Sequence, residues 1–228
     1  MELNKYIDHT NLKNTATLKD IEKLCNEAIK YKFASVCVYP YYVTLCKSLL
    51  KGTNVAVCTV IGFPSGMSTK ETKVYEAIDA VEKGAEEIDM VINIAALKNK
   101  DYDYVKDEIE DVRDAIDGKV LKVIIETCLL TDKEIVKMTE ICNETFVNFI
   151  KTSTGFSEYG ARVEDIELIK DHKNDLLEIK ASGGIKDIET AEAMINAGAT
   201  RIGTSNGVKL MNCGCDCEEH ECHCKEEK

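Results

Sequence analysis

The sequence predicts an α/β fold in which eight strand–helix units close into a parallel barrel. Short β-branched or apolar runs alternate with longer segments of helical period, a pattern typical of βαβ units and a parallel sheet. Eight such runs occur before residue 211, which gives about 26 residues per unit. The chain has 228 residues, enough for one such core, whereas two separate enzyme domains would be cramped.

The predicted strands are the eight β-branched or apolar runs. In chain order they cover residues 6–10, 35–39, 55–62, 87–93, 121–127, 147–152, 177–182 and 201–205. The only two prolines, Pro40 and Pro64, fall just after the second and third runs, where no ladder hydrogen bond is lost. An open doubly wound sheet usually has fewer strands, so the count favours a TIM (β/α)8 barrel.

The segments between the runs carry the apolar stripe of helices that cover a sheet. Residues 17–31 place Leu18, Ile21, Leu24, Cys25 and Ala28 at i, i+3, i+4 spacing. Residues 70–84 repeat the pattern and end in a lysine followed by a helix-stopping glycine. Residues 188–198 form a third such segment, with Asp187 as the expected N-cap.

Composition restricts the class of protein. With 44% hydrophobic and 31% charged residues, the chain resembles ordinary globular proteins, and no run of about 18 apolar residues could span a membrane. The first residues lack a secretory signal pattern, so we expect a cytoplasmic protein. The balance of 29 basic against 41 acidic residues, a net charge of −12, argues against a nucleic-acid partner.

Three ionisable residues stand late in predicted strands, where a barrel carries its catalytic groups. They are Asp89, Lys151 and Lys180. A single strand lysine more often extends outward between helices, but two on adjacent strands at matched heights, with an aspartate nearby, favour a catalytic site. Lys122 stands near the start of its run, so we expect it at the opposite, stabilising face with no catalytic role.

Two neighbouring lysines suit Schiff-base chemistry. A lysine amine attacks a carbonyl only when it is unprotonated, and at pH 7 only about one in 2,500 ordinary lysines is free. A second ammonium about 5 Å away costs the charged form about 3.3 kcal/mol, which raises the free fraction to roughly one in ten. One lysine would therefore be the nucleophile and the other its activating neighbour, while the ionised Asp89 relays a proton through water.

Glycine-rich turns follow the seventh and eighth predicted strands, where TIM barrels often hold a phosphate. Paired glycines let the backbone approach an anion, and the helix start near Asp187 offers free amides. Each turn alone is weak evidence, since glycines after strands are commonly simple turns. Together they predict a site for a small phosphorylated substrate at Gly183, Gly184, Gly203, Thr204, Ser205 and Asn206.

The last 17 residues differ from the rest, so we expect a barrel domain at 1–211 and an acidic Cys/His-rich tail at 212–228. Seven soft ligands in the tail suggest a short strip that binds zinc or copper. A disordered terminus with reduced thiols is the first alternative, and a redox or disulfide function is the second. The candidate metal ligands are Cys213, Cys215, Cys217, His220, Cys222, His223 and Cys224.

The body resembles the 2-deoxyribose-5-phosphate aldolase family of class I aldolases through nearly its whole length. FIKTSTGF, which contains Lys151, and IKASGGI, which contains Lys180, carry the most specific likeness. The other matching segments are YIDHTNL, SVCVYP, AVCTVIGFPSG, GAEEIDMVINIAALK, LKVIIET and RIGTSNGVKLM.

The resemblance implies a reaction and a set of roles. This family reversibly cleaves 2-deoxy-D-ribose 5-phosphate to D-glyceraldehyde 3-phosphate and acetaldehyde, without metal or organic cofactor, in deoxyribose phosphate catabolism. Lys151 would form the Schiff base, Lys180 would lower its pKa and move protons, and Asp89 would act through water on the acetaldehyde-derived carbon. Positions near the substrate would include Asp8, Thr10, Cys37, Thr152 and Thr154. Relatives are commonly homodimers.

Two departures from the family pattern concern substrate range and proton transfer. Where many relatives continue with a small GGAT-like turn, residues 157–162 read SEYGAR, a bulkier loop beside Lys151. Some relatives end in a tyrosine that assists proton transfer, whereas this tail contains no tyrosine. The alternatives to a deoxyribose-phosphate aldolase are another Schiff-base phosphosugar aldolase or transaldolase, and a barrel repurposed for metal handling through its tail.

Overall fold

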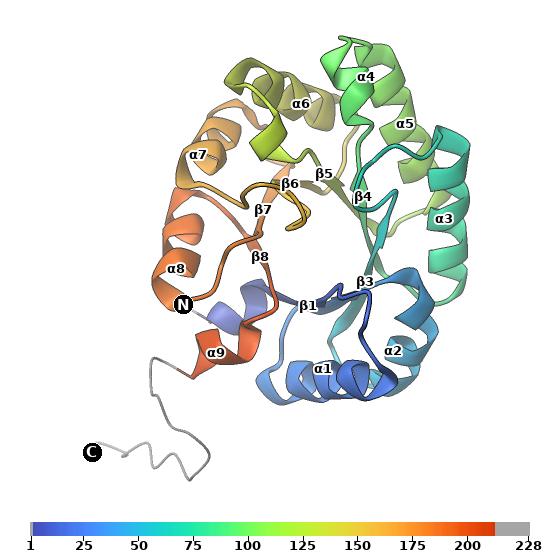
Figure 1. Cartoon of the computed structure of the whole chain (residues 1–228), viewed down its shortest axis with the longest axis vertical. Helices are drawn as coiled ribbons and strands as arrows, with labels where there is room; N and C mark the ends of the chain where they lie inside the picture. Colours follow the sequence, from blue (N-terminus) through green and yellow to red (C-terminus); the bar gives the residue numbers. More distant parts are fainter. Residues whose placement is uncertain (1, 213–228) are drawn as a thin grey trace.

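The computed structural model describes residues 2–212, and the Cys/His-rich stretch from residue 213 onward lies outside the described part. Eight parallel strands close into a barrel in sequence order, with β1 paired to β8 (Figure 1). The TIM-barrel prediction is confirmed. The strands are β1 (Ile7–Asn11), β2 (Ser35–Val38), β3 (Ala56–Ile61), β4 (Glu87–Val91), β5 (Val120–Ile124), β6 (Phe149–Lys151), β7 (Glu178–Ser182) and β8 (Arg201–Thr204).

Helices form a ring around the barrel (Figure 1). They are α1 (Leu18–Tyr31), α2 (Val43–Leu49), α3 (Lys70–Glu82), α4 (Ile94–Lys98), α5 (Tyr102–Ala115), α6 (Asp132–Glu144), α7 (Val163–His172), α8 (Ile188–Ala197) and α9 (Gly207–Met211). Three short 3₁₀ turns accompany them: η1 (Leu3–Tyr6), η2 (Pro40–Tyr42) and η3 (Thr127–Leu129). In the part of the chain between residues 2 and 212, no helix is long and apolar enough to cross a membrane.

The predicted helices form for the expected reasons. α1 begins after Thr17, whose side chain accepts from the Asp20 amide while Asp20 bonds back in a capping box. Of its predicted apolar stripe, Ile21, Leu24, Cys25 and Ala28 are buried against the barrel, whereas Leu18 in the first turn is 58% exposed. Asp187 caps α8 as predicted by accepting from the Thr190 amide.

Two predicted strands extend too far toward their C-terminal ends. Residues 92–93 lie beyond β4, where Asn93 caps α4. Residues 125–127 lie beyond β5, because Glu126 adopts φ +55° and ends the extended conformation before η3 begins. The apolar character of both segments comes from burial in loops, a property that a run of hydrophobic letters shares with strands.

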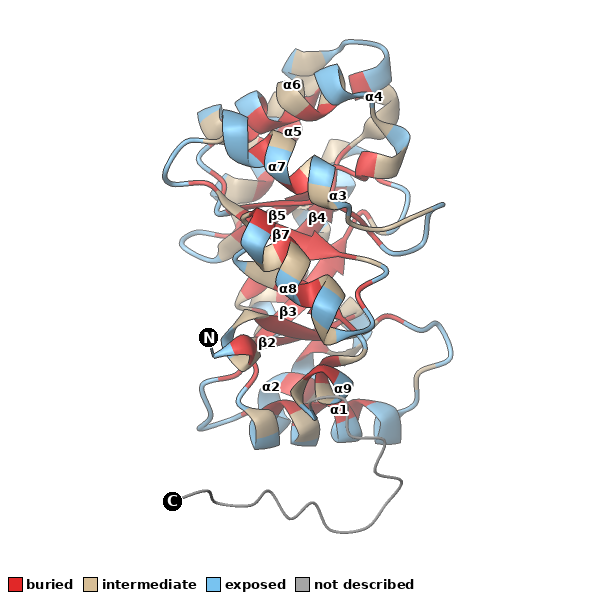
Figure 2. Ribbon diagram, turned by 90° about the vertical axis from the view of Figure 1, so that its left-hand side faces the viewer, coloured by how far each residue is buried: buried red, intermediate tan, exposed pale blue. Residues whose placement is uncertain are grey.

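The two faces of the barrel strands bury different kinds of side chain. The apolar core lies between the strands and the helices, and the strands at the centre of Figure 2 are almost entirely buried. Side chains on the opposite face of the strands meet inside the barrel, and there many are charged and fully buried. Cross-strand register pairs Lys151 with Lys180 and Asp89 with Lys122, so the ionisable residues occupy neighbouring heights.

Candidate active site

Seven ionisable side chains from six strands form one ion-pair network inside the barrel. Three are carboxylates and four are cations, so the network would carry one net positive charge if all were ionised. Ion pairs at these depths replace lost hydration only when their geometry is close and their hydrogen bonds are complete. The members are Asp8, Glu87, Asp89, Lys122, Lys151, Lys180 and Arg201.

Asp89 is the centre of this network. Its Oδ2 accepts hydrogen bonds from Lys151 Nζ at 2.8 Å and Lys180 Nζ at 2.7 Å. Its Oδ1 accepts from Lys122 Nζ at 2.9 Å and from Cys58 Sγ at 3.2 Å. Among the three residues predicted to be catalytic, Asp89 thus contacts both lysines; Lys151 ends β6, whereas Asp89 and Lys180 are the central residues of β4 and β7.

Asp89 is held as a carboxylate. Burial alone would raise the pKa of this side chain, because a charged group loses its hydration inside the barrel. The charges of Lys122, Lys151 and Lys180 outweigh burial and hold the pKa of Asp89 well below its ordinary value. The carboxylate can therefore orient the two lysines and accept a proton only transiently.

Lys180 is held as an ammonium. Burial would lower the pKa of its amine, but Asp8 and Asp89 outweigh burial and hold that pKa above its ordinary value. Its Nζ lies 2.5 Å from Asp8 Oδ2 and 2.7 Å from Asp89 Oδ2. Both Lys180 and Lys151 thus donate to the same oxygen of Asp89, which holds the Lys180 ammonium beside Lys151.

The expected place of Lys122 was wrong. This lysine is fully buried inside the barrel and lies 2.5 Å from Glu87 and 2.9 Å from Asp89. The nearby carboxylates outweigh burial and hold its pKa well above the ordinary value. In the predicted run 121–127 this lysine stood second, which suggested the opposite face, but β5 covers Val120–Ile124, so Lys122 is its central residue and pairs in register with Asp89.

Sequence reasoning also missed a supporting layer of charges. Arg201 Nη1 donates to Asp8 Oδ1 at 2.7 Å and to Glu87 Oε2 at 3.1 Å. The sequence did contain a sign of this layer, because residues two apart on a strand point to the same face. Glu87 precedes Asp89 by two residues, and Arg201 precedes Gly203 by two. Cys58 was missed for a different reason, because a strand thiol reads as a small hydrophobic residue.

The hydroxyl residues after Lys151 bind the protein itself. Thr152 Oγ1 donates to the Ser182 carbonyl at 3.3 Å and accepts from the Ser182 amide at 3.2 Å, which ties the end of β6 to that of β7. The Thr154 hydroxyl donates to Glu126 Oε2, and its amide donates to Glu126 Oε1 at 3.1 Å. These hydrogen bonds fix the loop that follows Lys151.

The two predicted phosphate loops lie side by side. Gly183 and Gly184 adopt φ +82° and +78°, a region that favours glycine. A Cβ at Gly203 would approach Lys180 Cε to 3.1 Å, whereas one at Gly184 would meet no atom within 4 Å. Thr204 Oγ1 donates to the Ile185 carbonyl at 2.7 Å and so joins the loops.

The remaining members of the predicted phosphate site follow β8. Ser205 is exposed, and the half-buried Asn206 donates its amide to Thr204 Oγ1 at 2.9 Å. These residues and the glycine turn after β7 lie at the same end of the barrel as Lys151, because the carboxyl ends of parallel strands share one face.

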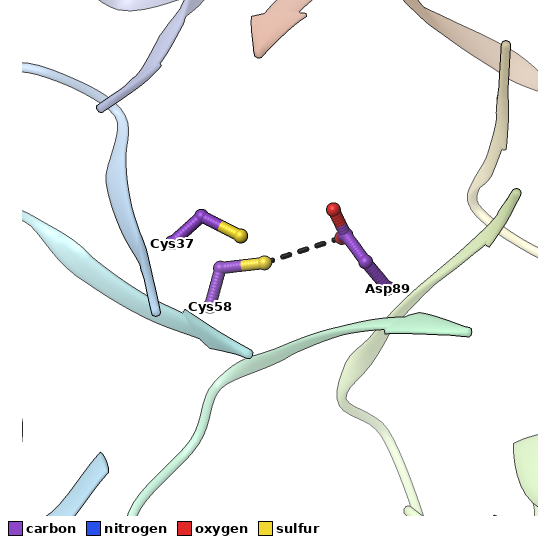
Figure 3. A group of neighbouring side chains, drawn as sticks. All are labelled: Cys37, Cys58 and Asp89. Atoms are coloured by element: carbon purple, nitrogen blue, oxygen red, sulfur yellow. Dashed lines mark hydrogen bonds between the residues drawn. The ribbon is translucent and has the colours of Figure 1, made fainter. Parts of the chain in front are cut away.

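Asp8, Thr10 and Cys37 enter the site from β1 and β2. Asp8 contacts Lys180 directly, whereas the Thr10 hydroxyl donates to the Asp8 carbonyl at 2.8 Å. Cys37 lies with Cys58 beside Asp89 (Figure 3). These three side chains have the ligand types of a metal site, but the ammonium groups that already bind Asp89 oppose a further cation there. The predicted tail ligands from Cys213 to Cys224 lie outside the described residues.

Comparison with known proteins places the chain in a family. The family model described as "DeoC/LacD family aldolase" matches residues 3–211. A deoxyribose-phosphate aldolase of Finegoldia magna is 58% identical over 211 residues, which cover 92% of this chain and 99% of the relative. One from Clostridium tetani is 56% identical over 212 residues, with 92% of this chain and 98% of the relative covered.

Solved structures agree in fold. A protein described as "QR15, an Aldolase" superposes with a TM-score of 0.89 at 44% identity, over 92% of this chain and 94% of that one. The deoxyribose phosphate aldolase of Aeropyrum pernix, described as a unique tetrameric structure, gives a TM-score of 0.86 at 32% identity, over 92% of this chain and 89% of the other. With a match that spans the whole barrel, the chain belongs to the DeoC/LacD family of aldolases.

Proposed function

We propose that this chain is a class I deoxyribose-phosphate aldolase. It reversibly cleaves 2-deoxy-D-ribose 5-phosphate to D-glyceraldehyde 3-phosphate and acetaldehyde. The relatives of Finegoldia magna and Clostridium tetani, named for this activity, support the substrate. The observation that carries the chemistry is the pair of buried lysines, Lys151 and Lys180, on one oxygen of Asp89.

Lys151 is the proposed nucleophile. Lys151 ends β6 and shares one oxygen of Asp89 with the Lys180 ammonium. The free amine attacks C1 of the open-chain sugar, and water leaves to give a protonated Schiff base.

Cleavage follows from the charge of the Schiff base. A base removes the proton of the C3 hydroxyl, the C2–C3 bond breaks, and its electron pair moves toward the positive nitrogen to form an enamine. Glyceraldehyde 3-phosphate leaves. Asp89, through water, and Lys180 supply and remove the protons, including the one that C2 gains before hydrolysis releases acetaldehyde. Asp8 positions Lys180 through their 2.5 Å contact.

The phosphate is proposed to bind at the turns after β7 and β8. The open space beside Gly184 and the exposed Ser205 support this placement. The two turns are shaped by Gly183, Gly203, Thr204 and Asn206. The sugar is proposed to pass near Cys37 and Thr10. Near Lys151, the loop beside the sugar is held in place by Thr152 and Thr154. No metal or organic cofactor takes part in this scheme, in keeping with the chemistry of the family.

Trapping with borohydride in the presence of acetaldehyde tests the proposal. The expected result is one reduced adduct at Lys151, found by peptide mapping and absent from Lys151→Leu. Lys133→Leu, at an exposed lysine near the start of α6, is the matched control and should be trapped like the wild type. Lys180→Leu should fold but lose turnover by about 10² to 10⁴-fold. An adduct on another lysine, or none, would refute the assignment.

The tail is proposed to bind a soft metal ion, an idea supported by its sequence alone. Five cysteines and two histidines between residues 213 and 224 exceed the four ligands that zinc requires. Zinc and copper titrations of the full chain and of a form ending at Met211 should differ in bound metal. Equal content in the two would disprove the role.

A homodimer in the cytoplasm is the proposed working form. The family resemblance supports the dimer, and the six cysteines of the described residues, all unpaired, suit a reducing compartment. Light scattering should give a mass of twice 25.4 kDa. A mass of one or four chains would contradict the dimer.

A further inference from the structure

Two cysteines face each other across neighbouring strands inside the barrel. Cys37 of β2 and Cys58 of β3 are direct partners in the strand register, and both are fully buried. Their Sγ atoms and a carboxylate oxygen of Asp89 all lie within 4.8 Å of one another. Figure 3 shows the two thiols side by side and directed toward Asp89.

This spacing suits a disulfide. Neighbouring strands lie about 4.8 Å apart, which is within the span of about 4.4–6.8 Å between the Cα atoms of disulfide-bonded cysteines. Because both side chains are on the same face, a rotation about each Cα–Cβ bond brings the sulfurs together. A disulfide is also neutral, whereas a bound metal cation would be repelled by Lys122, Lys151 and Lys180 around Asp89.

The two thiols have different surroundings, which give them different roles in the reaction. Cys58 Sγ donates to Asp89 Oδ1 at 3.2 Å, and burial raises the pKa of this thiol well above its ordinary value. Contact with Cys58 lowers the pKa of Cys37. Cys37 is thus the thiol that ionises first, and Cys58 is the resolving thiol.

We propose that Cys37 and Cys58 form an oxidant-sensitive dithiol that hydrogen peroxide converts to a disulfide within the active site. The Cys37 thiolate attacks one peroxide oxygen, an S–O bond forms, and the O–O bond breaks to release hydroxide, which becomes water on taking a proton. Cys58 Sγ then attacks the sulfenic sulfur as its proton passes to Asp89 Oδ1, an S–S bond forms, and the S–O bond breaks to release a second hydroxide, which takes that proton and becomes water. Two thiols lose two electrons, and one peroxide becomes two waters.

The disulfide switches the enzyme off, a consequence that rests on the proposed aldolase function. Oxidation removes the S–H donor from Asp89 Oδ1 and shifts the sulfur to which Lys122 Nζ donates at 3.3 Å. Asp89 then loses one of the contacts that align it with Lys151 and Lys180. Peroxide is no larger than the aldehyde that must reach Lys151, so it can enter by the same route.

Peptide mapping of the peroxide-treated full chain tests the bond itself. After free thiols are alkylated, digestion with trypsin and chymotrypsin separates Cys37 from Cys46, because Tyr41 and Tyr42 lie between them. The expected product is a peptide pair that joins residues 37 and 58 and disappears on treatment with dithiothreitol. The absence of this pair would overturn the proposal, whatever the activity of the enzyme.

Turnover of 2-deoxy-D-ribose 5-phosphate tests the consequence. Peroxide should lower the wild-type rate about tenfold or more, and dithiothreitol should restore it. Cys37→Ser and Cys58→Ser, each compared with its own untreated sample, should keep their rates. Cys25→Ser breaks a second thiol pair, the hydrogen-bonded Cys25 and Cys46 of α1 and α2, and should respond like the wild type. Equal loss in Cys37→Ser would place the damage elsewhere, the tail included, and overturn the proposal.

Discussion

The charge and orientation of Asp89 are determined by the side chains that contact it. Its carboxylate accepts from four donors, three of them lysines on three other strands. Asp89, Lys151 and Lys180 were predicted from the sequence because each is an ionisable residue that stands late in a predicted strand, toward the end where catalytic groups of barrels lie. Lys122 was misplaced because the predicted run 121–127 lay too far toward the C-terminal end, whereas Lys122 is the central residue of β5 and pairs with Asp89.

Substitution of Lys122 tests how much the ion-pair network contributes to stability. Replacing this lysine with methionine leaves Glu87 and Asp89, which lie two residues apart on β4, without the ammonium that both contact. We expect the free energy of unfolding to fall by about 3–5 kcal/mol, because a buried charge loses its partner. Turnover should fall as well. Urea unfolding and steady-state rates measure both effects, and the exposed Lys133→Met is the control. An unchanged midpoint would contradict the structural role.

At the scale of elements, a second buried ion pair fixes the loop after the strand that carries Asp89. Lys73 of α3 and Glu108 of α5 lie 2.6 Å apart and are both fully buried. Lys73 Nζ donates to the Val91 carbonyl at 2.8 Å, and Glu108 Oε2 accepts from the Asn93 amide at 2.9 Å. The two helices thereby hold the C-terminal end of β4.

The pair should be strongly coupled. Lys73→Met strands a buried carboxylate and is expected to cost about 3–5 kcal/mol, whereas Lys73→Met combined with Glu108→Leu should recover part of that loss. Urea denaturation of the wild type, both single variants and the double variant gives the coupling free energy. Additive losses would show that the two side chains do not stabilise each other.

His9 links β1 to the surrounding helices and makes stability depend on pH. Burial lowers the pKa of its imidazole, although Glu27 on α1, 2.8 Å from Nε2, acts in the opposite direction. Nδ1 is also buried and has no partner among the described residues. As pH falls below the ordinary histidine pKa of about 6.5, the unfolded chain takes up the proton first, so the folded state loses stability.

We expect the free energy of unfolding to fall with decreasing pH from about 6.5, with His9 contributing at most about 1.4 kcal/mol per pH unit. His9→Gln, which keeps a donor toward Glu27, should flatten this dependence. His172→Gln, on the exposed end of α7, should leave it unchanged. The measurement is urea unfolding at pH 7.5, 6.5 and 5.5. A His9→Gln slope equal to that of the wild type would contradict the assignment.

At the scale of the whole molecule, alternation alone was enough to predict the barrel. The eight predicted runs correspond one for one to β1–β8, because strands buried between helices must be apolar and short. The period of two along a strand could have placed Glu87 and Arg201 on the inward face, but the sequence could not supply the partners within the inward-facing network. Cys58, Glu87 and Arg201 belong to it through cross-strand contacts whose partners lie as far as 193 residues apart in the chain. No local pattern encodes such a separation.

The barrel is expected to fold and work without the residues that follow Met211. The family match ends at Met211, which is also the last residue of α9, and the ion-pair network around Asp89 lies wholly within the barrel. Residues 212–228 carry six acidic and two basic side chains, so their removal changes the net charge from −12 to −8.

A chain ending at Met211 loses the hydrogen bond from Tyr31 Oη to Asn212 Oδ1, a single exposed contact. We therefore expect a cost within about 0.5 kcal/mol and an unchanged kcat, measured by urea unfolding and the aldol assay, with Asn212→Ala in the full chain as control for the lost contact. A large loss of either quantity in the shortened chain alone would show that the tail is part of the folded enzyme.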